Sequence, residues 1–215
     1  YDYYFEPTAA YFAIKKASEP LHIQWNPATD EVEVVNYSAG THKGLTAKVQ
    51  ILNMDASVAW EKEATVDSNE DTTNKCIKLA FPANLSKVHF IKMVLTENGK
   101  VVSDNFYHRS LEENNYQDLR QLAKVALQST TTVDKNADGT WSAVSVIENK
   151  TSTPALMIRL NVVGSKDGQQ LLPVFYSDNY FSLLPGEKKE VRMSWKDEDT
   201  RGNEGKVLIT GYNVE

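Results

Sequence analysis

The sequence predicts an all-β protein made of two β-sandwiches in tandem, preceded by one short helix. Residues 6–17 have the features of a helix, and from residue 20 onward apolar side chains recur at every second position in short runs. The alternation is interrupted once, over residues 111–122, between two comparable series of runs. We therefore expect a helical segment at 1–19, a first sandwich at 20–115 and a second sandwich at 120–215.

The helix is predicted over residues 6–17. Pro7 suits a first helical position, and Glu6 favours the positive end of the helix dipole. Lys15 and Lys16 would lie in the last turn, and Pro20 would stop the helix. The residues expected to share one apolar face are Ala10, Tyr11 and Ile14. A lone helix before an all-strand chain is typical of the end of a preceding domain.

The first series of alternating runs predicts an antiparallel sandwich. Strands are expected near 32–35 and over 45–51, 58–66, 76–81, 88–96 and 101–108. The dipeptide Asn98-Gly99 gives the strongest hairpin signal, because both residues tolerate positive φ. Glu31 and Glu33 alternate with valines and are expected on the solvent-facing side of their strand.

The second series has the same character. Strands are expected over 126–133, 141–149, 156–163, 172–176, 189–195 and 206–212, with turns at Asp138-Gly139, Asp167-Gly168 and Pro185-Gly186. A short string is also repeated between the two halves, since residues 103–107 read SDNFY and residues 177–181 read SDNYF. The repeat is consistent with two related sandwiches.

Composition excludes several classes of function. The 215 residues carry a formal net charge of -6 without a cluster of Lys or Arg, so nucleic-acid binding is disfavoured. No apolar stretch approaches the length of a membrane span, so no membrane partner is expected. Cys76 is the single cysteine, which leaves no disulfide within the chain. It is expected to be a half-buried strand residue and not a nucleophile.

The residues that could carry chemistry form no catalytic or metal-binding motif. The 29 acidic residues lie mostly in turns or on solvated strand faces, so no catalytic carboxylate pair is predicted. The four histidines show neither an HxH nor an HExxH spacing. Residues 134–139 resemble the start of a calcium loop, but Ser145 stands where the loop needs a Glu, so a strand-joining turn is expected. No metal and no cofactor are predicted.

Sugar binding by a sandwich would require aromatic side chains on an exposed face or loop. The candidates among the tryptophans are Trp25, Trp60, Trp141 and Trp195, of which the last two sit at positions that alternation places in the core. A second candidate is the corner next to the Pro185-Gly186 turn, where aromatic and polar side chains cluster. Its residues are Tyr176, Asp178, Asn179 and Tyr180. The alternative for this corner is a packed end of the sandwich without ligand contacts.

Three strings carry a resemblance to a known family. They read AYFAIKKASEPLHIQ at 10–24, LLPVFYSDNYFSLLPGE at 171–187 and VLITGYN at 207–213. In this order they resemble the C-terminal immunoglobulin-like domains of glycoside hydrolase family 2, in the branch of exo-β-glucosaminidases and β-mannosidases. The likeness runs over nearly the whole chain.

The resemblance implies two immunoglobulin-like β-sandwiches that form a non-catalytic accessory region of a retaining exo-glycosidase. The partner would be the upstream catalytic (β/α)8 barrel of the same polypeptide, which carries the acid/base and nucleophile glutamates before Tyr1. The region would brace that barrel and border its substrate cleft at the corner, with an oligosaccharide as a second partner. Exposed apolar surface is then expected on the helix of residues 1–17.

Two other functions remain open at this point: an autonomous carbohydrate-binding or adhesin-like pair of sandwiches, and a structural spacer. The choice between a β-mannoside and a β-glucosaminide substrate is also open. The chain starts without Met and is expected to be part of a longer protein. A periplasmic or secreted location is favoured if that protein is a bacterial glycosidase.

Overall fold

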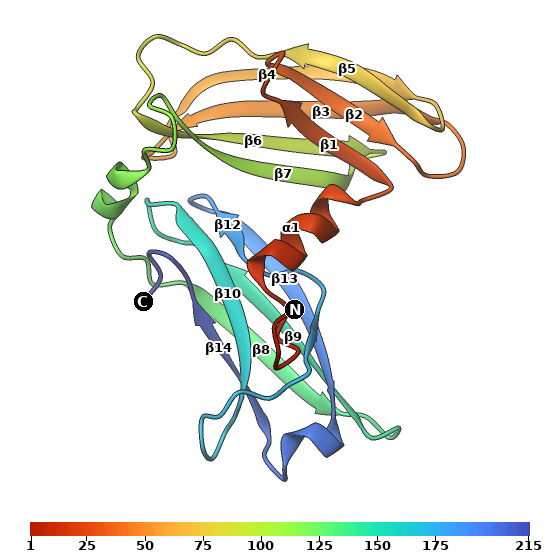
Figure 1. Ribbon diagram of the computed structural model, residues 1–215, viewed down its shortest axis with the longest axis vertical. Coiled ribbons are helices and arrows are strands. Elements are labelled where there is room, and N and C mark those ends of the chain that lie inside the picture. Colours follow the sequence, from red (N-terminus) through yellow and green to blue (C-terminus); the bar gives the residue numbers. More distant parts are fainter. The chain divides into compact units, whose positions relative to one another are not determined.

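The computed structural model describes residues 1–215, and nearly all of its regular structure is antiparallel β-strand (Figure 1). The chain divides into two compact units. One consists of Ile14–Gln121, and the other combines Tyr1–Ala13 with Leu122–Glu215. Each unit contains one three-stranded and one four-stranded sheet around its own apolar core. The predicted all-β fold with a short N-terminal helix is confirmed.

The first sandwich has seven strands. They are β1 (Leu21–Asn26), β2 (Glu31–Asn36), β3 (His42–Asn53), β4 (Val58–Ser68), β5 (Thr72–Lys78), β6 (Val88–Glu97) and β7 (Lys100–Ser110). One sheet has the order β1-β2-β5 and the other β4-β3-β6-β7. Asn98 and Gly99 join β6 to β7 with φ angles of 50° and 76°, as the hairpin signal predicted. A short 3₁₀ helix, η1 (Gln117–Gln121), follows β7.

The core of the first sandwich is formed by the inward-facing side of the alternation. Leu45, Val49 and Ile51 of β3 are fully buried together with Val32 and Val34 of β2. These residues form one contiguous cluster with inward side chains of the other strands. The period-two pattern in the sequence therefore identifies the core face of this unit correctly.

Glu33 departs from the expected pattern. Its exposed fraction is 6%, whereas alternation with the valines placed it on the solvent side. The side-chain amides of Gln24 and Asn26 each donate a hydrogen bond of 3.0 Å to its carboxylate. These donors come from the neighbouring strand β1, and they supply the bonds that a buried carboxylate requires. The expectation of a solvated Glu33 is therefore wrong.

The second sandwich also has seven strands. They are β8 (Gln128–Lys135), β9 (Thr140–Glu148), β10 (Ala155–Gly164), β11 (Phe175–Tyr176), β12 (Phe181–Leu183), β13 (Lys188–Lys196) and β14 (Gly205–Thr210). The sheets have the orders β12-β10-β14 and β11-β13-β9-β8. Trp195 is buried in the core, and its ring lies parallel to that of Trp141 with the centroids 6.3 Å apart. A 3₁₀ helix, η2 (Asp197–Thr200), follows β13.

The helix and two strands differ from their predicted limits. Helix α1 covers Ala9–Ala17, because residues before it form a separate turn in which Phe5 has φ of 64°. Strand β5 lies at Thr72–Lys78, earlier than the expected 76–81. The expected strand 172–176 is reduced to two residues, since Pro173 has no N–H to donate to a ladder. Strands β1 and β12 were not predicted.

Two histidines of the first sandwich are expected to make its stability depend on pH. Burial lowers the pKa of His89 and of His108, and nearby Arg109 lowers that of His89 further. Arg109 also donates a 3.2 Å hydrogen bond to Nε2 of His89, which requires that nitrogen to be unprotonated. Both folded-state pKa values therefore lie below the unfolded value, and the stabilisation is present above the unfolded pKa of about 6.5.

As the pH falls below about 6.5, we expect the free energy of unfolding to decrease by at most about 1.4 kcal/mol per pH unit for each histidine. Urea unfolding at a series of pH values measures this slope. A variant with His89→Gln and His108→Gln should show a flatter profile. An identical slope in the variant would contradict this origin of the pH dependence.

Candidate functional site

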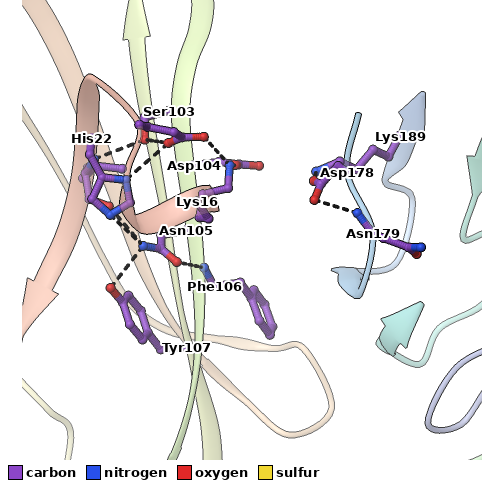
Figure 2. A network of polar contacts seen from close by, with 12 residues as sticks. Lys16, His22, Ser103, Asp104, Asn105, Phe106, Tyr107, Asp178, Asn179 and Lys189 are labelled. Carbon is purple, nitrogen blue, oxygen red and sulfur yellow. Dashed lines mark hydrogen bonds and ion pairs between the residues drawn. The ribbon is translucent and has the colours of Figure 1, made fainter. Parts of the chain in front are cut away.

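The corner predicted from the sequence lies in the second sandwich, between β11 and β12. Tyr176 ends β11, and the turn closes at Tyr180, whose φ of 57° is left-handed. Figure 2 shows Asp178 and Asn179 in this turn together with Lys189 of β13. The four predicted residues thus lie in one short segment, and their individual contacts determine which of them are free to meet a ligand.

The side-chain amide of Asn179 is hydrogen-bonded to the backbone of a neighbouring strand. Its exposed fraction is 4%, and its Oδ1 accepts a 2.8 Å hydrogen bond from the N–H of Leu160 in β10. Its Nδ2 donates a 3.0 Å hydrogen bond to the carbonyl oxygen of the same residue. Asp178 accepts a hydrogen bond from the N–H of Asn179 and forms an ion pair with Lys189. Both side chains therefore hold the corner in place.

The two tyrosines of the corner differ in their surroundings. Burial raises the pKa of Tyr176 to about 12, and its hydroxyl accepts a hydrogen bond of 3.3 Å from the N–H of Val162. Tyr180 is half-buried, and its ring centroid lies 6.0 Å from that of Phe12 in helix α1. Phe12 also contacts Tyr176 edge to face at 6.4 Å. Burial also raises the pKa of Tyr180.

The N-terminal turn adjoins this corner. Oδ1 of Asp2 accepts hydrogen bonds from the N–H groups of Tyr4 and Glu6, at 2.8 and 3.0 Å. The Glu6 carboxylate then pairs with the guanidinium of Arg159 in β10. The turn is therefore fastened to the second sandwich through Glu6, and its aromatic side chains are exposed.

A pocket of about 650 Å³ opens beside this turn, entirely within the second compact unit. Three aromatic residues line it, Tyr3, Tyr4 and Phe5, and Leu172 adds an apolar contact. The polar lining residues are Gln170, Asp199 and Arg201. This pocket could not be predicted from the sequence, because its walls come from three separate segments. The only local signal is the run of aromatic residues at the start of the chain.

The repeated SDN string has a parallel structural role in the first sandwich (Figure 2). Nδ2 of Asn105 donates a 3.3 Å hydrogen bond to the carbonyl oxygen of Ile23 in β1. Oγ of Ser103 accepts a 3.2 Å hydrogen bond from the N–H of Ile23 and donates one of 2.7 Å to Glu19. In both sandwiches the string therefore ties its own strand or turn to the backbone of another strand. This parallel supports a structural role for Asn179.

The remaining candidates also have structural surroundings. Burial raises the pKa of the Cys76 thiol to about 11, which disfavours the thiolate form that a nucleophile needs. Asp138, in the turn between β8 and β9, accepts hydrogen bonds from the backbone and the hydroxyl of Thr140. All four tryptophans pack against one of the two cores. None of the helices is both long and apolar enough to cross a membrane.

Comparison with protein families and known proteins gives a consistent result. The family model described as the exo-β-D-glucosaminidase Ig-fold domain matches residues 105–214. An exo-β-D-glucosaminidase from Streptomyces avermitilis is 32% identical over 99% of this chain, and one from Hypocrea jecorina is 30% identical over 100%. The chain spans 26% of the length of each of these relatives.

Solved structures show the same similarity. The exo-chitosanase CsxA of Amycolatopsis orientalis superposes on the whole chain with a TM-score of 0.92 at 28% identity, and the chain covers 28% of that protein. A β-D-mannosidase from Dictyoglomus thermophilum superposes over 96% of the chain with a TM-score of 0.67. Its identity of 16% supports a common fold only.

Proposed function

The chain belongs to the family of exo-β-D-glucosaminidase Ig-fold domains, and from this premise we propose that it is an accessory region of a glycosidase that acts on β-glucosaminides. It braces the catalytic domain of the same polypeptide and borders its substrate cleft. The family resemblance found in the sequence is confirmed. The proposal of β-glucosaminides over β-mannosides is supported by the greater similarity to exo-β-D-glucosaminidases.

The observation that carries the bracing role is the apolar surface near the start of the chain. Two large side chains of helix α1, Tyr11 and Ile14, are exposed, and the exposed aromatic residues that precede them belong to the turn beside the pocket: Tyr1, Tyr3, Tyr4 and Phe5. The bracing role is assigned to Tyr11 and Ile14. Exposed apolar side chains gathered in one segment mark a surface that contacts another body. A catalytic domain in the same polypeptide is the proposed partner, because the relatives are about four times as long as this chain.

The proposed bracing surface lies on one side of helix α1. Tyr11 and Ile14 are three residues apart and share one side of the helix, with exposed fractions of 43% and 67%. Phe12 is the buried residue of the helix and faces the tyrosines of the corner. The helix thus has one face packed on its own chain and one that is available to the proposed partner.

The bracing role is tested in the full-length enzyme with the variant Ile14→Glu. Burial of an isoleucine side chain contributes about 1.5–3 kcal/mol, and a charge in its place would oppose the contact. We expect the variant to lose glycosidase activity at a lower temperature than the unaltered enzyme. The matched control is Tyr37→Glu, because Tyr37 is a 70% exposed aromatic residue in a loop of the first sandwich. Equal inactivation temperatures for both variants would overturn the bracing role.

The autonomous carbohydrate-binding alternative requires an exposed aromatic platform. The four tryptophans do not provide one, because all of them pack against the cores. The exposed side chains that carry the bracing proposal lie instead on helix α1, at Tyr11 and Ile14. Bracing and cleft-bordering therefore account for the position of the exposed residues better.

A further inference from the structure

We propose that the pocket lined by Tyr3, Tyr4, Phe5, Gln170, Asp199 and Arg201 is a subsite for one glucosamine unit of the oligosaccharide substrate. The inference rests on the proposed function, because it presumes that the second sandwich borders the substrate cleft. The proposed sugar contact then lies in this pocket and not at the adjoining corner of four residues predicted from the sequence.

The corner itself has few groups to offer a sugar. The side-chain amide of Asn179 is hydrogen-bonded to the backbone of Leu160, and Asp178 forms an ion pair with Lys189. Tyr176 is largely buried, with its hydroxyl on the backbone of Val162. The polar residues of the pocket, Gln170, Asp199 and Arg201, differ from these corner residues. They come from two separate segments of the chain and line the same pocket. A ligand that binds near the corner would therefore form its hydrogen bonds with residues of the pocket.

The walls of the pocket are fixed by contacts outside it. The aromatic wall is held by the hydrogen bonds of Asp2 and by the ion pair between Glu6 and Arg159. The wall that carries Asp199 and Arg201 is held by Thr200, whose exposed fraction is 2% and whose hydroxyl donates a 2.7 Å hydrogen bond to the carbonyl oxygen of Asp197. An ordered backbone on both sides of the pocket reduces the cost of ordering the site when a ligand binds.

The chemistry of the lining suits an amino sugar. A volume of about 650 Å³ lies within the range of small-molecule sites, which combine aromatic walls with a few polar groups. The ammonium group of glucosamine is attracted by the Asp199 carboxylate and by the faces of the tyrosine and phenylalanine rings. Gln170 and Arg201 supply hydrogen-bond donors for the hydroxyl and ring oxygens. An N-acetylated sugar lacks the positive charge and would lose the interaction with Asp199.

The test uses the full-length enzyme with the variant Asp199→Asn, which removes the charge and keeps the shape. Hydrolysis is measured with glucosamine oligosaccharides of increasing length and with a chromogenic glycoside that carries a single glucosamine. We expect KM for the longer oligosaccharides to rise about tenfold, as for the loss of one charge-assisted contact, with kcat unchanged. The single-sugar substrate should be unaffected, because it does not reach the subsite.

The matched control is Glu198→Gln, since Glu198 precedes Asp199 in η2, does not line the pocket and pairs with Lys196 at the surface. A second variant, Tyr3→Ala, tests the aromatic wall. Because the Tyr3 side chain is 89% exposed, the substitution should leave folding unchanged. Unchanged KM values for the oligosaccharides in both pocket variants would overturn the inference. The bracing role is read separately from the thermal inactivation of Ile14→Glu, so failure of the subsite and failure of the proposed function give different results.

Discussion

Replacing Asn179 with alanine is expected to lower the free energy of unfolding of the second sandwich by about 3 kcal/mol. The side chain satisfies both the N–H and the carbonyl oxygen of Leu160, which is itself buried in the core. Each buried polar group that loses its partner costs about 1–3 kcal/mol. Urea unfolding followed by tryptophan fluorescence measures the change, because Trp141 and Trp195 both belong to this sandwich.

Tyr180→Phe is the companion variant at the same corner. It keeps the ring that packs near Phe12 and removes only the hydroxyl, so the free energy of unfolding should stay within about 0.5 kcal/mol of the original. This makes Tyr180, and not Asn179, the appropriate corner residue for kinetic experiments. An Asn179→Ala protein as stable as the unaltered one would show that the corner is not held through Leu160.

Replacing Gly205 with alanine is expected to destabilise the second sandwich by about 2–3 kcal/mol through overpacking. A Cβ atom at this position would lie 2.4 Å from Cζ2 of Trp195. Trp195 has little room to retreat, because its exposed fraction is 2% and its ring lies parallel to that of Trp141. The new methyl group must therefore displace either the indole ring or strand β14.

The matched control for this variant is Lys206→Ala, at the exposed neighbouring position of β14. It should leave both the midpoint of unfolding and the fluorescence of the folded state nearly unchanged. Gly205→Ala should shift the midpoint and also alter the near-ultraviolet circular dichroism of the tryptophan pair. If Gly205→Ala behaved like the control, the close packing between strand β14 and Trp195 would be refuted.

Much of the fold follows from local patterns in the sequence. Alternation in 45–51 predicted the buried face of β3, and the Asn98-Gly99 dipeptide predicted the β6–β7 hairpin, because both features depend on neighbouring residues only. The burial of Glu33 depends instead on amides from another strand, which no local pattern reveals. The short strand β12 was missed for a similar reason, since three residues give too little alternation to recognise.

The corner could be located from the sequence, whereas the contacts of its residues could not. Tyr176 and Asn179 were singled out because aromatic and amide groups cluster beside a turn, and the structure places them in one corner as expected. The hydrogen bonds of Tyr176 with Val162 and of Asn179 with Leu160 could not be predicted from the sequence, because those partners lie in another strand. The adjoining pocket requires residues near positions 3, 170 and 199 to converge, which only the folded chain shows.

We propose above that the exposed side of helix α1 contacts another domain of the same polypeptide. Hydroxyl-radical footprinting of the native full-length enzyme, read out by mass spectrometry, tests it most directly. Tyr37, which is 70% exposed, serves as the internal reference for Tyr11 and Ile14. We expect Tyr11 and Ile14 to be modified much more slowly, relative to Tyr37, than their exposure in this chain implies. Modification in proportion to their exposed fractions of 43% and 67% would contradict it.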